Sequence, residues 1–536
     1  MQGIKVTSIS KSALQDTNMI VPKSIDEQIK IGEYFSNIDN LITLHQCKFD
    51  LLHSLLQQFC QKLTILLKIV IIKLTNLQVF NKIKLTNMRK GRKVMFKRKI
   101  YNKLLQWKET SQGKTALLIE GPRRVGKSTV VEEFAKNEYE SYILVDFYKA
   151  SLETKELFDN LSDLNYIFLQ LQLTYRVSLK ERKSCIIFDE VQLCPKARAA
   201  IKALVNDGRY DYIETGSLIS IRKNVRDILI PSEERKIQMY PMDYEEFRWA
   251  LGDEVSVPLL KQLYEDKKAL GQAANRKMLR DFRLYMLVGG MPQAVDTFIS
   301  TNDFRQVDDI KRDILSLYED DFHKIDPTGK ISAIFDSIPA QLMGNASRYQ
   351  VSSVLTGNRA ADMLEQISKL KDSRTVLVSY HANDPGPGMA QNKDLKRFKL
   401  FTADTGLFVT LAFKDRDFTE NDIYSRLLNG KLQTNLGYLY ENIIAQTLAM
   451  NGHELYYHTF LNEKSKHNYE VDFILAEKNK ITPLEIKSSG YKTHPSIDIF
   501  SEKYSSRIKR KILIYTKDYH REGSIEYLPI IMAQFL

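Results

Sequence analysis

The chain has 536 residues, of which 43% are hydrophobic and 27% charged, so it is long enough for two or three domains with ordinary cores. Its four cysteines form no C-x-x-C pair and no zinc-ligand spacing, which excludes a disulfide scaffold and predicts reduced thiols in the cytoplasm. Residues 1–100 carry a net charge of +11 and residues 101–536 only +1, so overall basicity does not indicate nucleic-acid binding by the main body. The first thirty residues show no secretory signal, which favours a cytoplasmic location.

The first predicted element is a long helix within residues 1–67. Apolar residues recur at spacings of three and four, which predicts either an amphipathic helix or a coiled-coil seam of more than four heptads. The seam residues are Phe35, Ile38, Ile42, His45, Phe49, Leu52, Leu56, Phe59, Leu63 and Leu66.

Part of this helix resembles a known family. The stretch "IVPKSIDEQIKIGEYFSNIDNLITLHQCKFDLL", residues 20–52, is similar to the end of a target-recognition region and the following spacer helix in type I restriction-modification specificity subunits. The resemblance extends along the helix to residue 66. It implies possible partners among type I restriction-modification subunits. It covers almost none of a DNA-reading domain, so it implies a fragment that does not select a DNA sequence alone.

Residues 51–100 contain twelve basic residues and no acidic one. Lys68 and Lys73 interrupt the apolar run well short of the roughly 20 residues that a membrane span needs, so we expect a basic linker at 68–95 and no membrane helix. Met95 stands just before the chain becomes regularly patterned, and it is an alternative start of the native protein.

The stretch "LLIEGPRRVGKSTVVEEF", residues 117–134, predicts a nucleotide site. An apolar strand leads into G-x-x-x-x-G-K-S, and a helix follows. Glycines in such a loop let backbone N–H groups surround phosphates, the lysine reaches the β and γ phosphates, and the serine hydroxyl binds Mg²⁺. The positive end of the helix adds to phosphate binding. The predicted ATP-binding residues are Gly121, Gly126, Lys127, Ser128 and Thr129.

Two further strand ends support this site. In "SCIIFDEVQ" a buried strand delivers Asp189, which would hold Mg²⁺, and Glu190, which would polarise the attacking water. In "YDYIETGSL" either Thr215 or Ser217 could contact the γ-phosphate or that water. "YILVDF" and "RKIQMYPM" add two strands, so the pattern predicts an α/β fold with a five-stranded parallel sheet. Arg209 and Arg235 are candidates for an arginine finger, and Arg123 and Arg124 lie inside the loop.

The motifs "IEGPRRVGKST", "IIFDEVQ", "TGSL" and "IQMYPMDYEEF" resemble a prokaryotic family of AAA-type ATPases. "YMLVGGMPQAV" and "FKLFTADTGLF" extend the resemblance, which runs from about residue 96 to the C-terminus. It implies ATP and Mg²⁺ as cofactors. Many members of this family have no assigned role.

The middle of the chain predicts helices. Residues 255–345 alternate charged and apolar positions, which indicates a helical lid. Residues 347–381 predict short helices followed by a strand, a pattern compatible with a DNA-binding winged helix or with a packing module of the ATPase.

The last part of the chain predicts a second site. Glu441 lies near the start of a helix, and "NYEVDFILAEKNKITPLEIKSSG" predicts a hairpin with Asp472 on its first strand. Glu485 and Lys487 share one face of the second strand because side chains alternate along a strand. This E…D…E-x-K arrangement resembles the PD-(D/E)xK nuclease superfamily. The resemblance implies that Asp472 and Glu485 bind Mg²⁺, Glu441 completes the metal shell, and Lys487 orients or deprotonates water.

These observations leave three hypotheses open. The chain is an ATPase that controls a metal-dependent nuclease acting on nucleic acid, an ATP-driven switch that binds a partner or DNA while its nuclease-like domain is inert, or a restriction specificity component. DNA is the expected nucleic-acid partner. A homo-oligomer is possible in each case. The expected domains are a specificity-subunit-like fragment (1–67), a basic linker (68–95), an AAA-type ATPase domain (96–250), a helical lid with a possible winged helix (251–425) and a nuclease-like α/β domain (426–536).

Overall fold

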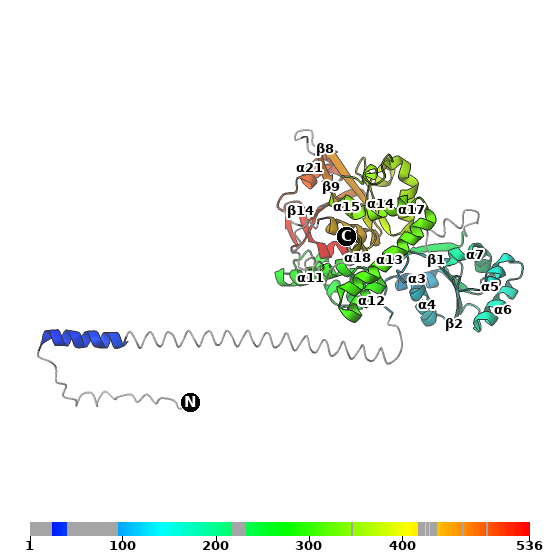
Figure 1. Ribbon diagram of the computed structural model, residues 1–536, viewed down its shortest axis with the longest axis horizontal. Helices are drawn as coiled ribbons and strands as arrows, with labels where there is room; N and C mark the ends of the chain where they lie inside the picture. Colours follow the sequence, from blue (N-terminus) through cyan, green and yellow to red (C-terminus); the bar gives the residue numbers. More distant parts are fainter. Residues whose placement is uncertain are drawn as a thin grey trace, which may run out of the picture. The chain divides into compact units, whose positions relative to one another are not determined.

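The chain divides into two units in the computed structural model, residues 1–94 and 95–536 (Figure 1). The structure describes residues 24–39, 95–216, 232–344, 347–415, 424, 428, 437–461, 466, 468–488 and 491–536. In the first unit residues 25–39 are helical, and Phe35 of the predicted seam is 62% exposed. The seam residues from Ile42 onward lie outside the described residues.

The second unit begins with a five-stranded, all-parallel sheet in the order β2-β3-β4-β1-β5. Every residue of the central strands β1, β3 and β4 is buried, as expected for the continuous apolar runs of a parallel sheet that is covered on both faces. The edge strand β5 is half exposed. The five strands predicted from sequence are confirmed.

The strands of this sheet are β1 Ala116–Glu120, β2 Ser141–Asp146, β3 Ser184–Asp189, β4 Asp211–Gly216 and β5 Glu234–Gln238. The accompanying helices are α3 Ile100–Ser111, α4 Lys127–Glu138, α5 Leu152–Glu156, α6 Leu164–Tyr175, α7 Pro195–Asp207 and α9 Tyr244–Ala250.

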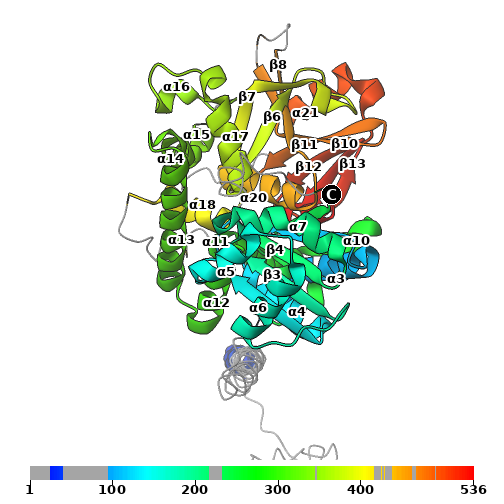
Figure 2. The same cartoon turned by 90° about the vertical axis from the view of Figure 1, so that its right-hand side faces the viewer.

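A helical region follows the ATPase-like sheet, as the charge and apolar pattern predicts. Its longest helix, α13, packs against α12 and α18 and passes along one side of the unit in Figure 2. The helices are α10 Ser256–Glu265, α11 Gln272–Val288, α12 Pro292–Thr301, α13 Phe304–Ile325, α14 Lys330–Asp336, α15 Ile338–Met343, α16 Val351–Val354, α17 Leu364–Ser373, α18 Thr405–Ala412 and α20 Gly437–Met450.

The C-terminal region is mixed α/β and contains two sheets. One has the order β7-β6-β8-β9, and the other has the order β10-β11-β12-β14-β13. Both contain parallel and antiparallel pairs. The elements are β6 Val376–Ala382, β7 Lys393–Thr402, β8 Tyr456–Leu461, β9 Asn468–Val471, β10 Phe473–Glu477, β11 Lys480–Lys487, α21 Pro495–Lys503, β12 Lys511–Tyr515, β13 His520–Glu522 and β14 Ile525–Pro529.

The predicted hairpin is present as the antiparallel pair β10 and β11, with its turn after Glu477. One detail of the prediction is wrong: Asp472 is not inside the first strand but at a bend between β9 and β10. β9 pairs with β8 in one sheet, and β10 pairs with β11 in the other, so the chain passes from one sheet to the other at this bend. Asp472 therefore lies where the two C-terminal sheets meet.

Candidate nucleotide and carboxylate sites

The loop between β1 and α4 has the backbone that its glycines predict. Gly126 has φ +96°, which favours glycine, and it caps α4. A Cβ at Gly121 would lie 2.4 Å from the carbonyl oxygen of Met239, so the loop packs directly against the residue after β5. Lys127 folds over the loop, and its Nζ donates hydrogen bonds to the carbonyls of Gly121 and Pro122, both at 3.0 Å. The loop therefore holds its lysine close to its own backbone.

Three predicted residues meet at one carboxylate oxygen. Ser128 donates a hydrogen bond to Asp189 Oδ1 at 2.7 Å, and the hydroxyl of Thr215 donates to the same oxygen. Asp189 and Thr215 are buried at the carboxyl ends of β3 and β4. Hydroxyl and carboxylate oxygens are the ligands that Mg²⁺ prefers, so these residues fit the predicted ion. Ser217 lies outside the described residues.

Glu190 follows directly and has a left-handed backbone, with φ 54° and ψ 46°. This conformation is uncommon for a residue with a side chain. The Nε2 of Gln192 donates a hydrogen bond to the carboxylate of Glu190. Sequence reasoning did not select Gln192, although it stands two residues after the predicted glutamate in "DEVQ". Gln192 is therefore a positioning residue for Glu190.

The loop lysine is buried, and burial disfavours its charged form. Burial therefore lowers the pKa of Lys127 below its ordinary value of 10.5, and the carboxylates of Glu190 and Asp189 offset part of this effect. These same carboxylates are the predicted catalytic and Mg²⁺-binding groups. The lysine and the two acids therefore share one electrostatic environment.

Arg123 links the loop to α13. Its Nη1 lies 3.0 Å from Asp321 Oδ1, and the hydroxyl of Tyr318 donates to the carbonyl of Arg123 at 3.3 Å. An arginine in a phosphate-binding loop is a natural phosphate ligand because its guanidinium can bind phosphate oxygens in pairs. In this structure the guanidinium is directed to a carboxylate of the helical region. Arg124 has a left-handed backbone, with φ 66°.

We expect Asp321→Asn to tighten nucleotide binding, because it releases Arg123 from a competing carboxylate. An exposed ion pair contributes up to about 1 kcal/mol, so the Kd for ATP should fall by about two- to fivefold. Titration with a fluorescent ATP analogue measures the change. Asp320→Asn is the matched control because Asp320 is the exposed neighbour on the same helix. An unchanged Kd in Asp321→Asn would show that the pair does not restrain Arg123.

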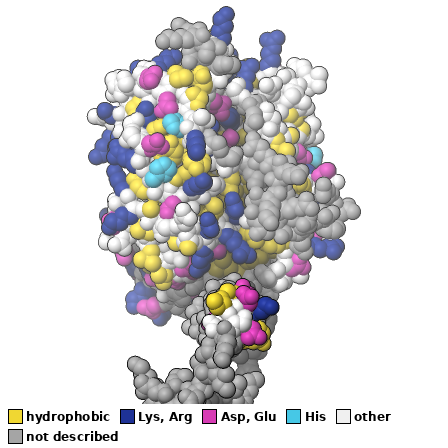
Figure 3. Space-filling view, turned by 90° about the vertical axis from the view of Figure 1, so that its left-hand side faces the viewer, with side chains coloured by type: hydrophobic (Ala, Val, Ile, Leu, Met, Phe, Trp, Pro, Cys, Tyr) yellow, Lys and Arg dark blue, Asp and Glu magenta, His cyan; other side chains and the backbone are white. Residues whose placement is uncertain are grey.

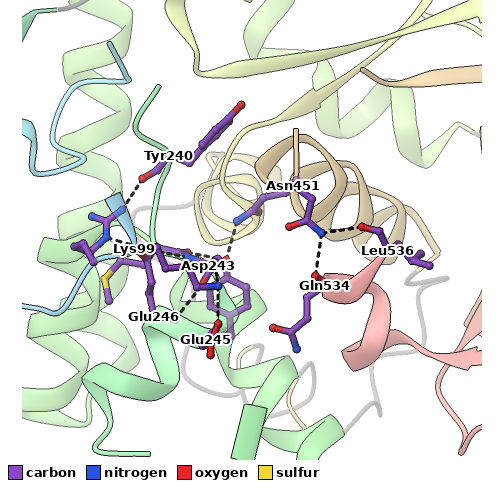
Figure 4. A network of polar contacts seen from close by, with 12 residues as sticks. Lys99, Tyr240, Asp243, Glu245, Glu246, Asn451, Gln534 and Leu536 are labelled. Carbon is purple, nitrogen blue, oxygen red and sulfur yellow. Dashed lines mark hydrogen bonds and ion pairs between the residues drawn. The ribbon is translucent and has the colours of Figure 1, made fainter. Parts of the chain in front are cut away.

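Arg98 supports the loop from behind, and sequence reasoning missed it. Its side chain is buried, and its two terminal nitrogens donate to the carbonyls of Val125 at 3.0 Å and Tyr240 at 2.7 Å. Its Nε lies 3.1 Å from Glu246, which belongs to the capping box of α9. Figure 4 shows this neighbourhood, with Lys99 beside Asp243 and Glu245. Arg98 lies before α3, outside the strand–loop–helix pattern that marks the nucleotide site, so no motif includes it.

The sheet is joined to the C-terminal region through a junction without space for side chains. A Cβ at Gly290 would lie 2.1 Å from the carbonyl oxygen of Met242, and one at Gly406 would lie 2.5 Å from Gly289 Cα. The carboxylate of Asp404 accepts hydrogen bonds from the backbone N–H groups of Gly290 at 2.6 Å and Leu407 at 2.9 Å. The "VGGMP" and "ADTGL" segments therefore pack directly against each other.

A chain of hydrogen bonds continues from this junction to α20. The hydroxyl of Tyr285 donates to the carbonyl of Met242 at 2.7 Å and accepts from Gln446 Nε2 at 2.9 Å. Gln446 Oε1 accepts from the backbone N–H of Thr405 at 2.8 Å. Gln446 lies on the same helix as Glu441 of the second predicted site. The junction is therefore connected by hydrogen bonds to the helix that carries Glu441.

The second site is a cavity of about 400 Å³ in the C-terminal region. Three carboxylates line it, those of Glu441, Glu470 and Asp472, together with the ammonium group of Lys399. Glu485 and Lys487 are not among its lining residues; they form an ion pair of 2.7 Å with each other. The residues lining the cavity are Leu342, Ser347, Lys399, Glu441, Thr459, Asn468, Tyr469, Glu470 and Asp472.

Two carboxyl groups of this cavity, those of Asp472 and Glu441, hold protons more tightly than usual. Burial, reinforced by the neighbouring Glu441 and Glu470, raises the pKa of Asp472 well above its ordinary value. Burial also raises the pKa of Glu441, which Lys399 partly offsets. Sequence reasoning missed Lys399 and Glu470. The "FKLF" stretch contains Lys399, but nothing in its spacing relates it to carboxylates seventy residues later.

The predicted Mg²⁺ ligands do not all line this cavity: Glu441 and Asp472 do, and Glu485 does not. Across the described part of the chain, no three or more His, Cys, Asp or Glu side chains form a group that could hold a metal. Asp472 Oδ2 accepts a hydrogen bond from the backbone N–H of Ile486 at 2.7 Å. Glu485 Oε2 accepts one from the N–H of Ile497 at 3.2 Å. Asp472 and Glu485 therefore each accept a hydrogen bond from a different backbone N–H group.

The two arginine-finger candidates lie near the amino ends of their strands, away from the loop. Arg209 pairs with Asp207 at 2.7 Å and its guanidinium lies 4.6 Å from the ring of Phe168. Arg235 donates to the hydroxyl of Thr110 at 3.3 Å. Because nucleotides bind at the carboxyl edge of a parallel sheet, neither can act on the site of its own chain.

Glu214, which precedes Thr215, is fully buried in β4. Burial, reinforced by the Glu234 carboxylate, raises the pKa of Glu214 well above its ordinary value of 4.5. In the unfolded chain Glu214 loses its proton near pH 4.5, whereas in the folded chain Glu214 keeps its proton to a higher pH. The free energy of unfolding should therefore fall as pH rises from 4.5 toward the folded pKa.

We expect Glu214→Gln to remove this dependence, because the amide keeps the shape of the side chain and does not ionise. Its melting temperature should exceed that of the wild type at about pH 8, and the difference should shrink toward pH 4.5. Calorimetry across this range measures the effect, and Glu156→Gln on the surface is the control. A difference that stays constant with pH would contradict the assignment.

The charged surface is mixed. On the face shown in Figure 3, Lys and Arg side chains are spread with Asp and Glu side chains between them. This agrees with the near-zero net charge of residues 101–536. Among the described residues no helix is both long and apolar enough to cross a membrane.

Comparisons with protein families match three successive parts of the chain. Residues 113–248 match an AAA domain (AAA_14). Residues 279–417 match a domain of unknown function, DUF8612, and residues 436–531 match another, DUF4143. The curated proteins that were searched contain no match to this chain.

Solved structures give more distant similarities. The Walker-type ATPase PABY2304 of Pyrococcus abyssi is 17% identical over 59% of this chain and 96% of its own, with a TM-score of 0.38. PCH-2 of C. elegans is 12% identical over 38% of this chain and 62% of its own, with a TM-score of 0.24. The RuvB Holliday junction branch migration motor of Thermotoga maritima is 13% identical over 52% of this chain and 89% of its own, also with 0.24.

All three TM-scores are below 0.5, so the ATPase fold is assigned from the family match and from the structure itself. The matched segment contains the glycine loop and the strands β1 to β5 of the all-parallel sheet. This chain therefore contains a P-loop ATPase domain of the AAA type, followed by a mixed α/β C-terminal region.

Proposed function

We propose that this chain binds and hydrolyses ATP with Mg²⁺ at the carboxyl edge of its parallel sheet. The meeting of Ser128 and Thr215 at one oxygen of Asp189 is the observation that carries the proposal. Ser128 and Asp189 would hold Mg²⁺, which neutralises charge on the β and γ phosphates when bound. Lys127 would bind those phosphates.

The remaining roles follow from position. Gly121, Gly126 and Thr129 would place backbone and hydroxyl groups around the phosphates. Glu190 would polarise the attacking water, and Thr215 or Ser217 would contact the γ-phosphate or that water. Release of phosphate by the purified chain tests the proposal directly. If no nucleoside triphosphate is hydrolysed with Mg²⁺ present, the chain is not an ATPase.

We further propose that the nucleotide cycle acts as a switch on the C-terminal region. Two connections support this: the ion pair between Arg123 and Asp321, and the hydrogen-bonded path from Gly290 through Tyr285 to α20. Any change in the loop on ATP binding would therefore act on α13 and α20, and α20 carries Glu441 of the second site. Hydrogen exchange measured with and without ATP should change protection in α13 and α20.

The alternative is a Mg²⁺-dependent nuclease with a PD-(D/E)xK-like site acting on DNA. In its favour, Glu441 and Asp472 line one cavity, and Asp472 binds the backbone of the strand that carries Glu485 and Lys487. The test is incubation of the chain with plasmid, Mg²⁺ and ATP. Cleavage that is lost in both Asp472→Ala and Lys487→Ala would establish the nuclease. We expect no cleavage, because the carboxylates are bound to protein donors.

The restriction-like helix supports a separate, weaker proposal of a protein partner. Residues 25–39 are helical, as the resemblance implies. Co-purification with a type I methyltransferase subunit tests it, and the same chain starting at Met95 is the control. Failure to recover a complex with the full chain would leave residues 95–536 as the functional part.

A further inference from the structure

The cavity of the C-terminal region contains its own positive charge. Lys399 is 7% exposed, and its ammonium group pairs with Glu470 and lies 3.8 Å from Glu441 Oε2. Asp472 lines the same cavity. A single buried ammonium group therefore contacts two carboxylates and shares the cavity with a third.

The ammonium group of Lys399 lies among side chains from several elements. Lys399 belongs to β7, Glu470 belongs to β9, and Glu441 belongs to α20. β7 and β9 are the two edge strands of their sheet, so the ion pair joins them. Nζ of Lys399 also lies 5.6 Å from the centre of the ring of Tyr457. The ammonium group is held by packing as well as by charge.

A divalent cation and this ammonium group would compete for the same oxygens. Two cations at such short separation repel strongly in a buried site. Removing the lysine from the cavity would also leave its hydrogen-bonding partners unsatisfied. Mg²⁺ normally requires several oxygen ligands directed at one point, and with Lys399 in place the described carboxylates form no group that could hold a metal ion.

We propose that Lys399 is the resident cation of this cavity and takes the place that a divalent metal ion would need. The cavity is then a metal-independent site whose carboxylates hold strands and a helix together. Glu441 connects it to α20, which also carries Gln446 of the path to the ATPase sheet. The cavity therefore shares α20 with the hydrogen-bonded path between the ATPase sheet and the C-terminal region. This inference does not depend on ATP hydrolysis.

Binding of Mn²⁺ to the nucleotide-free chain tests this proposal by electron paramagnetic resonance, which reports free Mn²⁺. The full chain with Asp189→Asn is used, because this substitution removes the predicted metal ligand of the ATP site. We expect it to bind no more Mn²⁺ than the same chain with Asp472→Asn added. Mn²⁺ bound by the first and lost in the second overturns the proposal.

A gain of binding provides the second measurement. Lys399→Met in the Asp189→Asn background should bind one Mn²⁺ that depends on Asp472, because the carboxylates have lost their cation. Lys396→Met, on the exposed part of the same strand, is the matched control and should bind none. A folded Lys399→Met chain without Mn²⁺ overturns the proposal. If Lys399→Met does not fold, Mn²⁺ binding by Asp189→Asn with and without Asp472→Asn decides the proposal alone.

Discussion

Glu190→Gln is expected to reduce the rate of ATP hydrolysis by about 10²–10⁴-fold, the usual contribution of a general base. The amide keeps the size of the side chain but no longer accepts a proton from the attacking water. Nucleotide binding should be retained, because Lys127, Ser128 and Asp189 are unchanged. Phosphate release and ATP-analogue binding are therefore measured on the same preparation.

Two further variants separate the roles in this site. Lys127→Ala should lose both binding and hydrolysis, because it removes the group that reaches the phosphates. Glu156→Gln changes an exposed glutamate of the same domain and should leave both unchanged. Hydrolysis that survives in Glu190→Gln and in Lys127→Ala would show that the active site lies elsewhere.

Asp404→Ala is expected to lower the free energy of unfolding by about 3 kcal/mol, because it leaves buried N–H groups of Gly290 and Leu407 without their acceptor. Asp404 is 2% exposed, so bulk water does not reach these N–H groups in the wild type. The substitution also removes the cap of α18. Urea unfolding of the full chain measures the loss.

The same substitution tests the connection between the two regions. If the junction transmits the nucleotide state, ATP should protect α20 from hydrogen exchange in the wild type and not in Asp404→Ala. Asp313→Ala, on the exposed side of α13, is the control and should change neither quantity. Unfolding equal to that of the wild type would mean that the carboxylate does not stabilise the junction.

The ATPase region was largely predictable, because its signals are local. Each strand is a continuous apolar run, and the catalytic candidates stand within two residues of a strand end. Parallel strands then bring Asp189 and Thr215 to one edge. Arg98 could not be found in this way, since its partners Val125 and Tyr240 are distant in the chain.

The C-terminal site was predicted only in part, because its lining residues come from five separate helices and strands. The hairpin and its E-x-K spacing follow from alternation along a strand. The direction of each carboxylate does not, because it depends on which backbone N–H group lies opposite, as for Asp472 and Ile486. The pairing of Lys399 with Glu470 joins two edge strands, and no local pattern records it.

By itself, therefore, the sequence determined the glycine loop, the five-stranded sheet and the acidic strand end, because apolar runs and glycines act on their own neighbours. Tertiary structure decided which groups share a buried space. It directed Arg123 to Asp321, tied Asp404 to Gly290 and placed Lys399 among carboxylates. A buried charge needs a partner, and packing of distant segments selects it.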